Sequence, residues 1–430
     1  MEKKTIMTGL GEITGAILPD GVEFRGVRYA IAKRWHFPQL VSHWDGVYDA
    51  SSGFGKKSPQ YHWSTEEFYG KEFYADPAFD VEESEDCLYM TITVPKEGVP
   101  KPEGGYPVAI WYHGGAMVNG WGTEQEFDGE AFAKRGVILC RVNERLGLFG
   151  GFCHPALIER DGLAGNYQLA DHIAALEFVY RHIGDFGGDP EKITIFGQSA
   201  GSMGVEAMLC SPKTAGMVRG AIMQSGISYV FTNRMLPSME EAAAAGEAFL
   251  KEKGFTFEAF EALPMNELYA LTDEYRAFAK NGGGFAPILD GVYLTKNYND
   301  AVQDGEANAK FLMAGCCADD MRMDKDHPER SPLYQAVRGW CNEMNRQEGK
   351  KAYAYFFERK MPGDDAGAFH SAELWYVFGS YKRCWRPLTE KDAALSERMT
   401  DAWTSFCKDG DPGFAPCTEA EPFFMHWDVE

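Results

Sequence analysis

The amino-acid sequence predicts an α/β protein whose central sheet is mostly parallel and carries helices on both faces. From residue 108 onwards, short apolar runs typical of buried strands alternate with longer helix-compatible segments. Strands that alternate with helices need crossover connections, which give a parallel, two-sided sheet. A serine, Ser199, lies where one of these runs turns into a helix-compatible segment. Because ligands of such sheets bind beyond the carboxyl ends of the strands, we expect a site at this serine.

The first hundred residues predict β-hairpins. The runs 11–18 and 22–29 flank Pro19-Asp20-Gly21, a turn signal between β-prone segments. A further strand is expected at 88–94, where Pro95 ends it. The predicted elements then follow in the order strand 108–112, helix 124–135, strand 137–142, helix 167–183, and strands 192–196, 220–224, 310–315 and 352–357.

The region from 230 to 282 has a different composition, rich in Ala and Glu, which predicts several helices. We expect a single domain over residues 1–430, with this region as a helical insertion over the active-site end of the sheet. Two interpretations of the insertion stay open. Its helices either roof a substrate cleft or only pack on the side of the core.

Composition limits the partners. The formal net charge of −22 argues against nucleic acid or an anionic membrane surface, because both need a basic footprint. The ten cysteines form no C-x-x-C pair and no Cys/His cluster, so we expect no metal site. No apolar stretch reaches the length of a membrane span. These features favour a cytoplasmic, reduced protein, and they leave its oligomeric state unknown.

The segment around Ser199 is the most informative in the chain. Gly197 and Gly201 stand two residues to either side of Ser199, after a β-branched run and before a helix-compatible segment. A tight strand-to-helix turn strains its apical residue and needs small flanking residues, so it presents the serine oxygen as a nucleophile elbow. The N–H of the next residue, Ala200, then points at the reacting centre.

A second group of small residues follows the predicted strand 108–112. The sequence there is Tyr112-His113-Gly114-Gly115-Ala116-Met117, and its small residues leave backbone N–H groups exposed. Preorganised donors aimed at a developing oxyanion contribute about 3–4 kcal/mol each. Together with the elbow, this turn predicts an oxyanion hole.

A serine nucleophile needs a base and an acid, in the chain order Ser, acid, His. Three histidines follow Ser199. His327 lies in a charged, turn-prone stretch and His426 is interpreted as a packing residue, whereas His370 lies in a loop after the predicted strand 352–357. The acid is expected just past the strand 310–315, where Asp319 and Asp320 are adjacent and not separable by these criteria.

Motifs along most of the chain resemble those of the type-B carboxylesterases, the group that includes cholinesterases, mammalian carboxylesterases and bacterial para-nitrobenzyl esterases. The resemblance implies an α/β-hydrolase fold. Besides the elbow, the motifs that carry it are Phe24-Arg25-Gly26-Val27-Arg28-Tyr29-Ala30, Glu85-Asp86-Cys87-Leu88-Tyr89-Met90, Asn143-Glu144-Arg145-Leu146-Gly147, Gly165-Asn166-Tyr167, Phe186-Gly187-Gly188-Asp189-Pro190, Gln224-Ser225-Gly226, Pro287-Ile288-Leu289-Asp290-Gly291 and Glu373-Leu374-Trp375-Tyr376-Val377-Phe378-Gly379.

The resemblance implies a role for each matching position. Ser199 would be the nucleophile, His370 the base, and Asp320 the acid, with Asp319 as its neighbour. The oxyanion donors would be the N–H groups of Gly115, Ala116 and Ala200, while Ser225 and Gln198 would lie behind the triad. The expected mechanism is acylation of the serine followed by hydrolysis, with no metal or cofactor.

Three departures from the family pattern bear on function. Asp320 replaces the usual glutamate and is one methylene shorter, so the local loop must compensate. Gln198 replaces the glutamate of cholinesterases, which argues against a quaternary ammonium substrate. Ser58 stands where secreted relatives carry the cysteine that pairs with the equivalent of Cys87, so we expect Cys87 to be unpaired.

The expected activity is that of a serine carboxylesterase. The alternatives on the same machinery are thioester or amide cleavage, and a hydroxycinnamoyl (feruloyl-type) esterase is one possible specific activity. A non-catalytic binding homologue would need extracellular targeting and a broken triad, and the chain shows neither.

Overall fold

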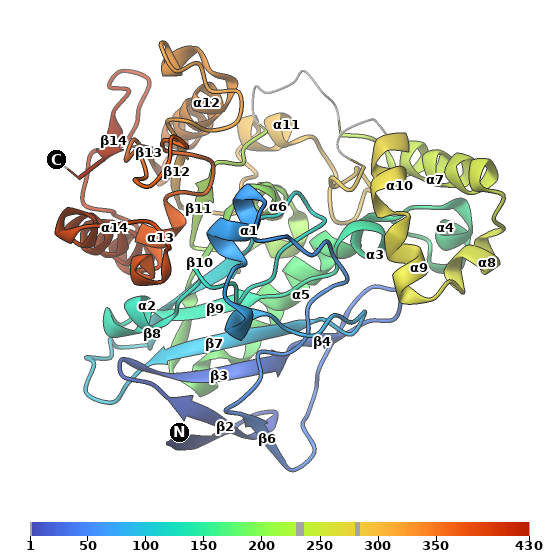
Figure 1. The fold of residues 1–430 in the computed structure, drawn as a ribbon, viewed down its shortest axis with the longest axis horizontal. Helices are drawn as coiled ribbons and strands as arrows, with labels where there is room; N and C mark the ends of the chain where they lie inside the picture. Colours follow the sequence, from blue (N-terminus) through green and yellow to red (C-terminus); the bar gives the residue numbers. More distant parts are fainter. Residues whose placement is uncertain (1, 229–235, 280–283, 430) are drawn as a thin grey trace.

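The computed structural model describes residues 2–228, 236–279 and 284–429. Within them, twelve strands form one sheet in the order β1-β2-β3-β7-β9-β8-β10-β11-β12-β13-β14, with β6 beside β2 (Figure 1). These strands are β1 (Lys3–Thr8), β2 (Gly11–Ile17), β3 (Gly21–Arg28), β6 (Val47–Ala50), β7 (Tyr89–Pro95), β8 (Tyr106–Tyr112), β9 (Ile138–Val142), β10 (Gly188–Gln198), β11 (Gly220–Gln224), β12 (Phe311–Cys317), β13 (Lys351–Phe357) and β14 (Phe424–Trp427), while β4 (Ala30–Ile31) and β5 (Gln39–Leu40) pair separately.

The helices lie between and around these strands. They are α1 (Phe68–Phe73), α2 (Glu130–Lys134), α3 (Gly147–Gly151), α4 (Pro155–Asp161), α5 (Tyr167–His182), α6 (Ala200–Leu209), α7 (Met239–Lys253), α8 (Phe257–Glu261), α9 (Met265–Ala270), α10 (Thr272–Phe278), α11 (Tyr298–Gln303), α12 (Pro332–Arg346), α13 (Leu374–Val377) and α14 (Glu390–Asp409).

The sheet is mixed, with its antiparallel part at the N-terminal edge. β1, β2, β3, β7 and β9 pair antiparallel in succession, as the predicted hairpin requires. From β9 through β8, β10, β11, β12 and β13 to β14, every pair is parallel. The predicted fold class, an α/β-hydrolase fold with N-terminal β-hairpins and a mostly parallel sheet, is confirmed.

Helices cover both faces of the sheet because its central strands are buried on both sides. Side chains alternate along β8, so Val108, Ile110 and Tyr112 join a cluster with α5, α6 and α12. Ala109 and Trp111 face the other side, where α2, α13 and α14 pack. Because both faces of these strands are buried, their sequences are continuous apolar runs.

The helix predicted at 124–135 is wrong over its first half. Only α2 is helical, and the chain before it forms turns. The Glu124 carboxylate bends back to accept the Trp121 N–H at 2.8 Å. Gly129 begins the helix at a close contact, since a Cβ there would lie 2.2 Å from the Thr93 hydroxyl oxygen. These local contacts override the helical propensity of the segment.

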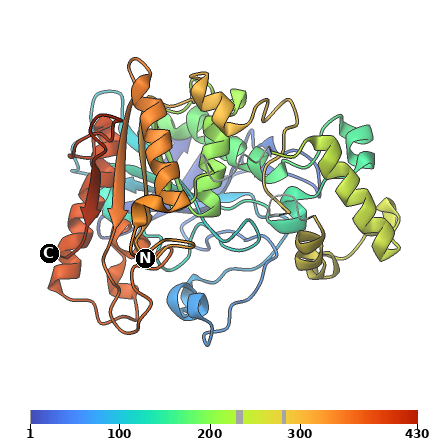
Figure 2. The ribbon, with the colours of Figure 1, turned by 90° about the horizontal axis from the view of Figure 1, so that it is seen from above.

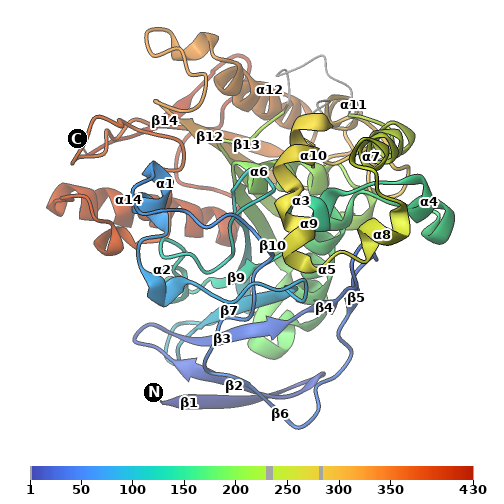
Figure 3. The same cartoon turned by 45° about the vertical axis from the view of Figure 1, so that its right-hand side comes forward.

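The helical region after β11 packs at one side of the sheet. Figures 1 and 3 show α7 to α10 grouped beside α3 and α4, and in Figure 2 these yellow-green helices lie opposite the red C-terminal segment. They share a separate apolar cluster with Trp35, Phe152 and Tyr167. The predicted helices are therefore present in 239–278, whereas 230–235 and 280–282 lie outside the described residues.

Among the described residues, no helix has the length and apolar character to cross a membrane. All ten cysteines are free, which confirms the expectation that Cys87 is unpaired. Ser58, which stands where secreted relatives carry the partner cysteine, accepts the Leu146 N–H with its hydroxyl at 3.0 Å.

Candidate active site

Ser199 stands at a strained turn between β10 and α6. Its backbone has φ 55° and ψ −121°, a conformation that only the surrounding structure can hold. A Cβ at Gly201 would lie 2.1 Å from the Tyr112 carbonyl oxygen, and one at Gly197 would lie 2.5 Å from the Gly201 carbonyl carbon. Both glycines are therefore required by contact, as the elbow motif predicts.

The ends of three neighbouring strands are joined behind this turn. The Ser199 N–H donates to the Gln224 carbonyl at 2.8 Å, and the Ser225 N–H donates to the Gly315 carbonyl at 2.8 Å. Ser225 is also strained, with φ 51°. It lies directly behind the serine, because a Cβ at the next residue, Gly226, would lie 2.0 Å from the Ser199 carbonyl oxygen.

The structure distinguishes the two adjacent aspartates by what they contact. His370 Nδ1–H donates to Asp320 Oδ1 at 2.6 Å. The Asp320 carboxylate is buried and also accepts the backbone N–H groups of Cys317 at 3.2 Å and Met321 at 2.8 Å. It is therefore held rigidly at the end of β12, facing the histidine.

Asp319 points to the backbone of the histidine loop instead. Its carboxylate accepts the Ala368 N–H at 2.8 Å and pairs with Lys325 Nζ at 2.5 Å. A Cβ at Gly367 would lie 2.1 Å from this carboxylate. Asp319 thus anchors the loop that carries His370 and does not contact the imidazole.

His370 is 8% exposed, so both burial and its acidic neighbours act on its pKa. Burial alone disfavours the charged form, but the Asp320 hydrogen bond and charge, with a smaller effect from Glu373, raise the pKa of His370 above its ordinary value. Glu373 is itself buried, and burial raises the pKa of its carboxyl group. Its oxygens contact Gln224 Nε2 at 3.3 Å and Cys317 Sγ at 3.0 Å.

The other imidazole nitrogen contacts Gln198. Gln198 Nε2 lies 3.1 Å from His370 Nε2. Because the Nδ1 proton is directed at Asp320, Nε2 accepts from the glutamine amide. His370 and Ser199 line the same pocket, but the hydrogen bonds of the described residues include none between the serine hydroxyl and Nε2. Such contacts tighten in many enzymes only when substrate binds.

The turn after β8 exposes its N–H groups. Gly115, Ala116 and Met117 all have positive φ, at 100°, 55° and 64°. The Gly115 carbonyl is turned inward and accepts from the N–H groups of Val118 and Asn119, both at 3.0 Å. None of the hydrogen bonds recorded for the described residues uses the N–H of Gly115, Ala116 or Ala200.

Ser199, Asp320 and His370 border one pocket with a volume of about 580 Å³, a size typical of small-molecule sites. Most of the described wall is apolar or amide, and α7 to α10 contribute no residue to it. The residues before and after those helices do. The described wall consists of Ser199, Met203, Ser225, Gly226, Ile227, Ser228, Leu236, Pro237, Ala286, Pro287, Asn297, Tyr298, Asn299, Asp300, Asp320, Met321, Arg322, Leu333 and His370.

The other two downstream histidines lie away from this pocket wall. The His327 side chain is 49% exposed, as its charged surroundings predict. The interpretation of His426 as a packing residue is wrong: its side chain is 57% exposed and contacts Glu358 at 2.7 Å. β14 is the edge strand, so this side chain, between the buried Phe424 and Trp427, reaches solvent.

Sequence reasoning missed one buried group near the site. Glu144 lies at ion-pair distance from two histidines, His113 and His172, each 3.2 Å away. Glu144 was visible in the motif that follows β9, but nothing local to it signals that two histidines from other elements meet it.

A nucleophile turn, a histidine–aspartate pair and a donor-rich turn at the carboxyl end of a mostly parallel sheet define the class of the α/β hydrolases. The comparison with known proteins gives the family. The model described as "Carboxylesterase family" matches residues 2–329 and 322–427. The chain belongs to the carboxylesterase family and is a carboxylic ester hydrolase.

Individual relatives agree with this assignment. Para-nitrobenzyl esterase of Bacillus subtilis (strain 168) is 29% identical over 468 residues, covering 96% of this chain and 91% of that protein. Fumonisin B1 esterase of Sphingopyxis macrogoltabida is 34% identical over 288 residues, covering 65% of this chain and 50% of that protein. The solved structure of a thermophilic PNB esterase has a TM-score of 0.84 at 25% identity, covering 99% of this chain and 96% of that one.

Proposed function

We propose that this protein hydrolyses small carboxylic esters through an acyl-enzyme formed on Ser199. The observation that carries the proposal is the His370–Asp320 hydrogen bond of 2.6 Å at the wall of the pocket that Ser199 also lines. A pocket-lining serine at a strained elbow, with an oriented histidine in the same pocket, is the arrangement that acyl transfer requires.

In the acylation half, the Ser199 hydroxyl attacks the ester carbonyl carbon and passes its proton to His370 Nε2. For this step the Ser199 hydroxyl replaces the Gln198 amide as the hydrogen-bond donor to His370 Nε2. Asp320 holds the ring by Nδ1 and stabilises the imidazolium that forms. The imidazolium then donates its proton to the departing alkoxide, which leaves as the alcohol.

In the second half, water attacks the acyl-enzyme and His370 takes its proton. The tetrahedral carbon collapses, the serine oxygen recovers a proton from the imidazolium, and the carboxylic acid leaves. In both halves the carbonyl oxygen carries negative charge, and the N–H groups of Gly115, Ala116 and Ala200 are proposed to bind it. Their freedom from other acceptors in the described structure supports this role.

Thioester or amide cleavage would use the same groups, and a hydroxycinnamoyl ester is one candidate within the ester class. A panel of matched p-nitrophenyl esters, thioesters and anilides, with short and aromatic acyl groups, separates these activities. We expect esters to be turned over fastest. Faster turnover of anilides than of matched esters would contradict the proposal.

The nucleophile is tested with Ser199→Ala. We expect turnover to be lost and labelling by a fluorophosphonate to disappear, with an unchanged melting temperature because the half-buried hydroxyl makes no recorded hydrogen bond. Retained turnover would mean that another residue is the nucleophile.

We also propose a cytoplasmic location and a single domain with a helical insertion. The ten free thiols support the location, since disulfides are rare in reducing compartments. Cell fractionation tests the location, and limited proteolysis between β11 and α11 tests whether the insertion can be cut without releasing a separate domain.

A further inference from the structure

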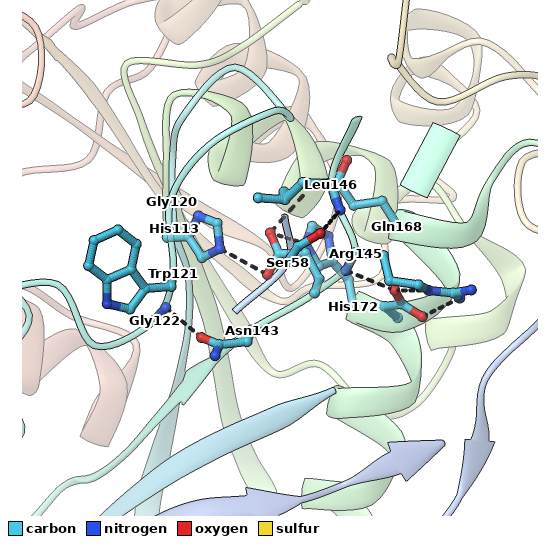
Figure 4. A network of polar contacts seen from close by, with 12 residues as sticks. Ser58, His113, Gly120, Trp121, Gly122, Asn143, Arg145, Leu146, Gln168 and His172 are labelled. Carbon is cyan, nitrogen blue, oxygen red and sulfur yellow. Dashed lines mark hydrogen bonds and ion pairs between the residues drawn. The ribbon is translucent and has the colours of Figure 1, made fainter. Parts of the chain in front are cut away.

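A buried carboxylate joins two histidines beneath the candidate site. Glu144 follows β9. His113, which follows β8, and His172, on α5, are labelled in Figure 4. His113 Nε2 lies 3.2 Å from Glu144 Oε2, and His172 Nε2 lies 3.2 Å from Glu144 Oε1. The three side chains are between 1% and 3% exposed. Neither contact is aligned as a hydrogen bond.

The contacts of His113 require a doubly protonated ring. Its Nδ1 lies 2.8 Å from the Gly114 carbonyl oxygen, which can only accept, so Nδ1 carries a proton. Its Nε2 faces the Glu144 carboxylate and also needs a proton, because two lone pairs would repel. The ring fills the space that Gly120 leaves, since a Cβ there would lie 2.5 Å from Nδ1.

The two histidines belong to different halves of the proposed oxyanion hole. His113 lies two residues before Gly115 in the turn that carries Gly115 and Ala116. His172 packs on α6, where a Cβ at Gly204 would lie 2.7 Å from its ring, one turn beyond Ala200. A cavity of about 10 Å³, the size of roughly one water, is bordered by His172 and Ala200 and also by Met117, the one residue of the turn after β8 in its described wall.

The surroundings of His113 and Glu144 favour the charged form of both side chains. Burial opposes ionisation of His113, but Glu144 and, more weakly, Glu124 raise the pKa of His113 to about 9. Burial likewise opposes the Glu144 anion, but both histidines lower the pKa of Glu144 to about 2. The other titratable groups that face Glu144 are Tyr29, Cys87 and Tyr112. Asp171, which pairs with Arg145, faces His172. Lys57 faces Glu124.

We propose that Glu144 is a positioning residue for acyl transfer, which ties the turn of Gly115 and Ala116 to the helix that begins at Ala200 through His113 and His172. The inference rests on the proposed function. It adds a residue that touches no substrate but sets the distance between donors contributed by two separate elements. Donors of an oxyanion hole act only when aimed at one point, so their relative placement affects the transition state more than the bound substrate.

Glu144→Gln tests the proposal, because it removes the charge and keeps the size. Losing one oxyanion donor outright costs about 10²–10³ in kcat, so misplacing donors should lower kcat by roughly 10-fold. We expect KM for the p-nitrophenyl ester to change less than about twofold. Binding of a trifluoromethyl ketone, which mimics the tetrahedral state, should weaken in parallel with kcat.

The pH profile gives a readout that a merely structural role would not move. Because the pKa of His113 is raised, its ion pair is intact below that pKa and is lost as the pH rises through about 9. We therefore expect kcat of the wild type to fall near that pH. In Glu144→Gln, burial keeps the ring neutral, so kcat should start low and show no alkaline fall.

Glu177→Gln is the matched control, since it removes a half-buried carboxylate that pairs only with Arg181 among the recorded ion pairs of the described residues. It lies on the same helix as His172 and should leave kcat and the pH profile unchanged. If Glu144→Gln folds poorly, His172→Ala and His172→Gln decide the question. The glutamine can still donate toward Glu144, so it should restore most of the kcat that alanine loses.

A variant with a lower melting temperature but wild-type kcat and an unchanged alkaline limb would overturn the proposal. Fluorophosphonate labelling separates this failure from failure of the proposed function. Ser199 should still be labelled in Glu144→Gln, more slowly than in the wild type, whereas an enzyme that uses another nucleophile would still be labelled in Ser199→Ala.

Discussion

Gln198 Nε2 lies 3.1 Å from His370 Nε2, the imidazole nitrogen on the side away from Asp320. The residue before the nucleophile therefore contacts the base that the nucleophile must use. A neutral amide at this position donates a hydrogen bond to the neutral imidazole, whereas a carboxylate would favour the imidazolium.

Gln198→Glu should consequently shift the acidic limb of the pH–rate profile. The base must be neutral to accept the serine proton, and the pKa of His370 is already raised by Asp320, so activity is lost as the pH falls through that raised pKa. A second carboxylate beside Nε2 raises it further and moves the limb to higher pH. A limb that stays in place would show that the two side chains do not interact in solution. Initial rates of the wild type and of Gln198→Glu between pH 5 and 9 measure the position of the acidic limb.

Asp320→Asn should lower kcat far more than Asp319→Asn. The first change replaces the acceptor of the Nδ1 proton and should cost on the order of 10⁴-fold, as loss of the triad acid does in other serine hydrolases. The second weakens the anchoring of the loop at Ala368 and should mainly lower the melting temperature. Equal losses of kcat in the two variants would contradict the assignment of Asp320 as the triad acid. Kinetics and thermal unfolding of both variants provide the comparison.

Gly201→Ala should destabilise the fold strongly. The added Cβ would meet the Tyr112 and His113 carbonyl oxygens at 2.1 and 2.4 Å, and both are backbone atoms that cannot move aside. We expect a loss of about 3 kcal/mol or more in the free energy of unfolding. Gly184→Ala is the control, because a Cβ there meets nothing within 4 Å. Urea unfolding that gave the two variants equal stability would refute the contact argument.

Arg322 should favour substrates that carry a carboxylate. It is the only arginine or lysine in the described wall of the pocket, and no ion pair is recorded for it among the described residues. Arg322→Gln should reduce kcat/KM for a p-nitrophenyl hemisuccinate by about fivefold relative to the neutral pentanoate, as expected for one partly exposed charge-assisted contact. Arg338→Gln, an exposed change on α12 outside the wall, is the control. An unchanged ratio would exclude the contact.

Much of the fold could be predicted because its signals are local. The apolar runs of β8, β9, β10, β11, β12 and β13 were each found within a few residues, and so were the hairpin at Asp20 and the long helix α5. The helix predicted at 124–135 failed where a local contact of Glu124 and a tertiary contact of Gly129 compete with propensity. The side-on packing of α7 to α10 depends on which apolar faces meet, and a linear pattern does not contain that information.

The sequence by itself determined the strained turn at Ser199, the donor-rich turn after β8 and the choice of His370 among three histidines. These follow from glycine spacing and from the position of loops after strands. Only the tertiary structure showed that Asp320 and not Asp319 contacts His370. It also placed Gln198 against the imidazole and brought Glu144 between two histidines. His370 is 50 positions from Asp320 and 172 from Gln198, so the packing of separate elements sets these contacts.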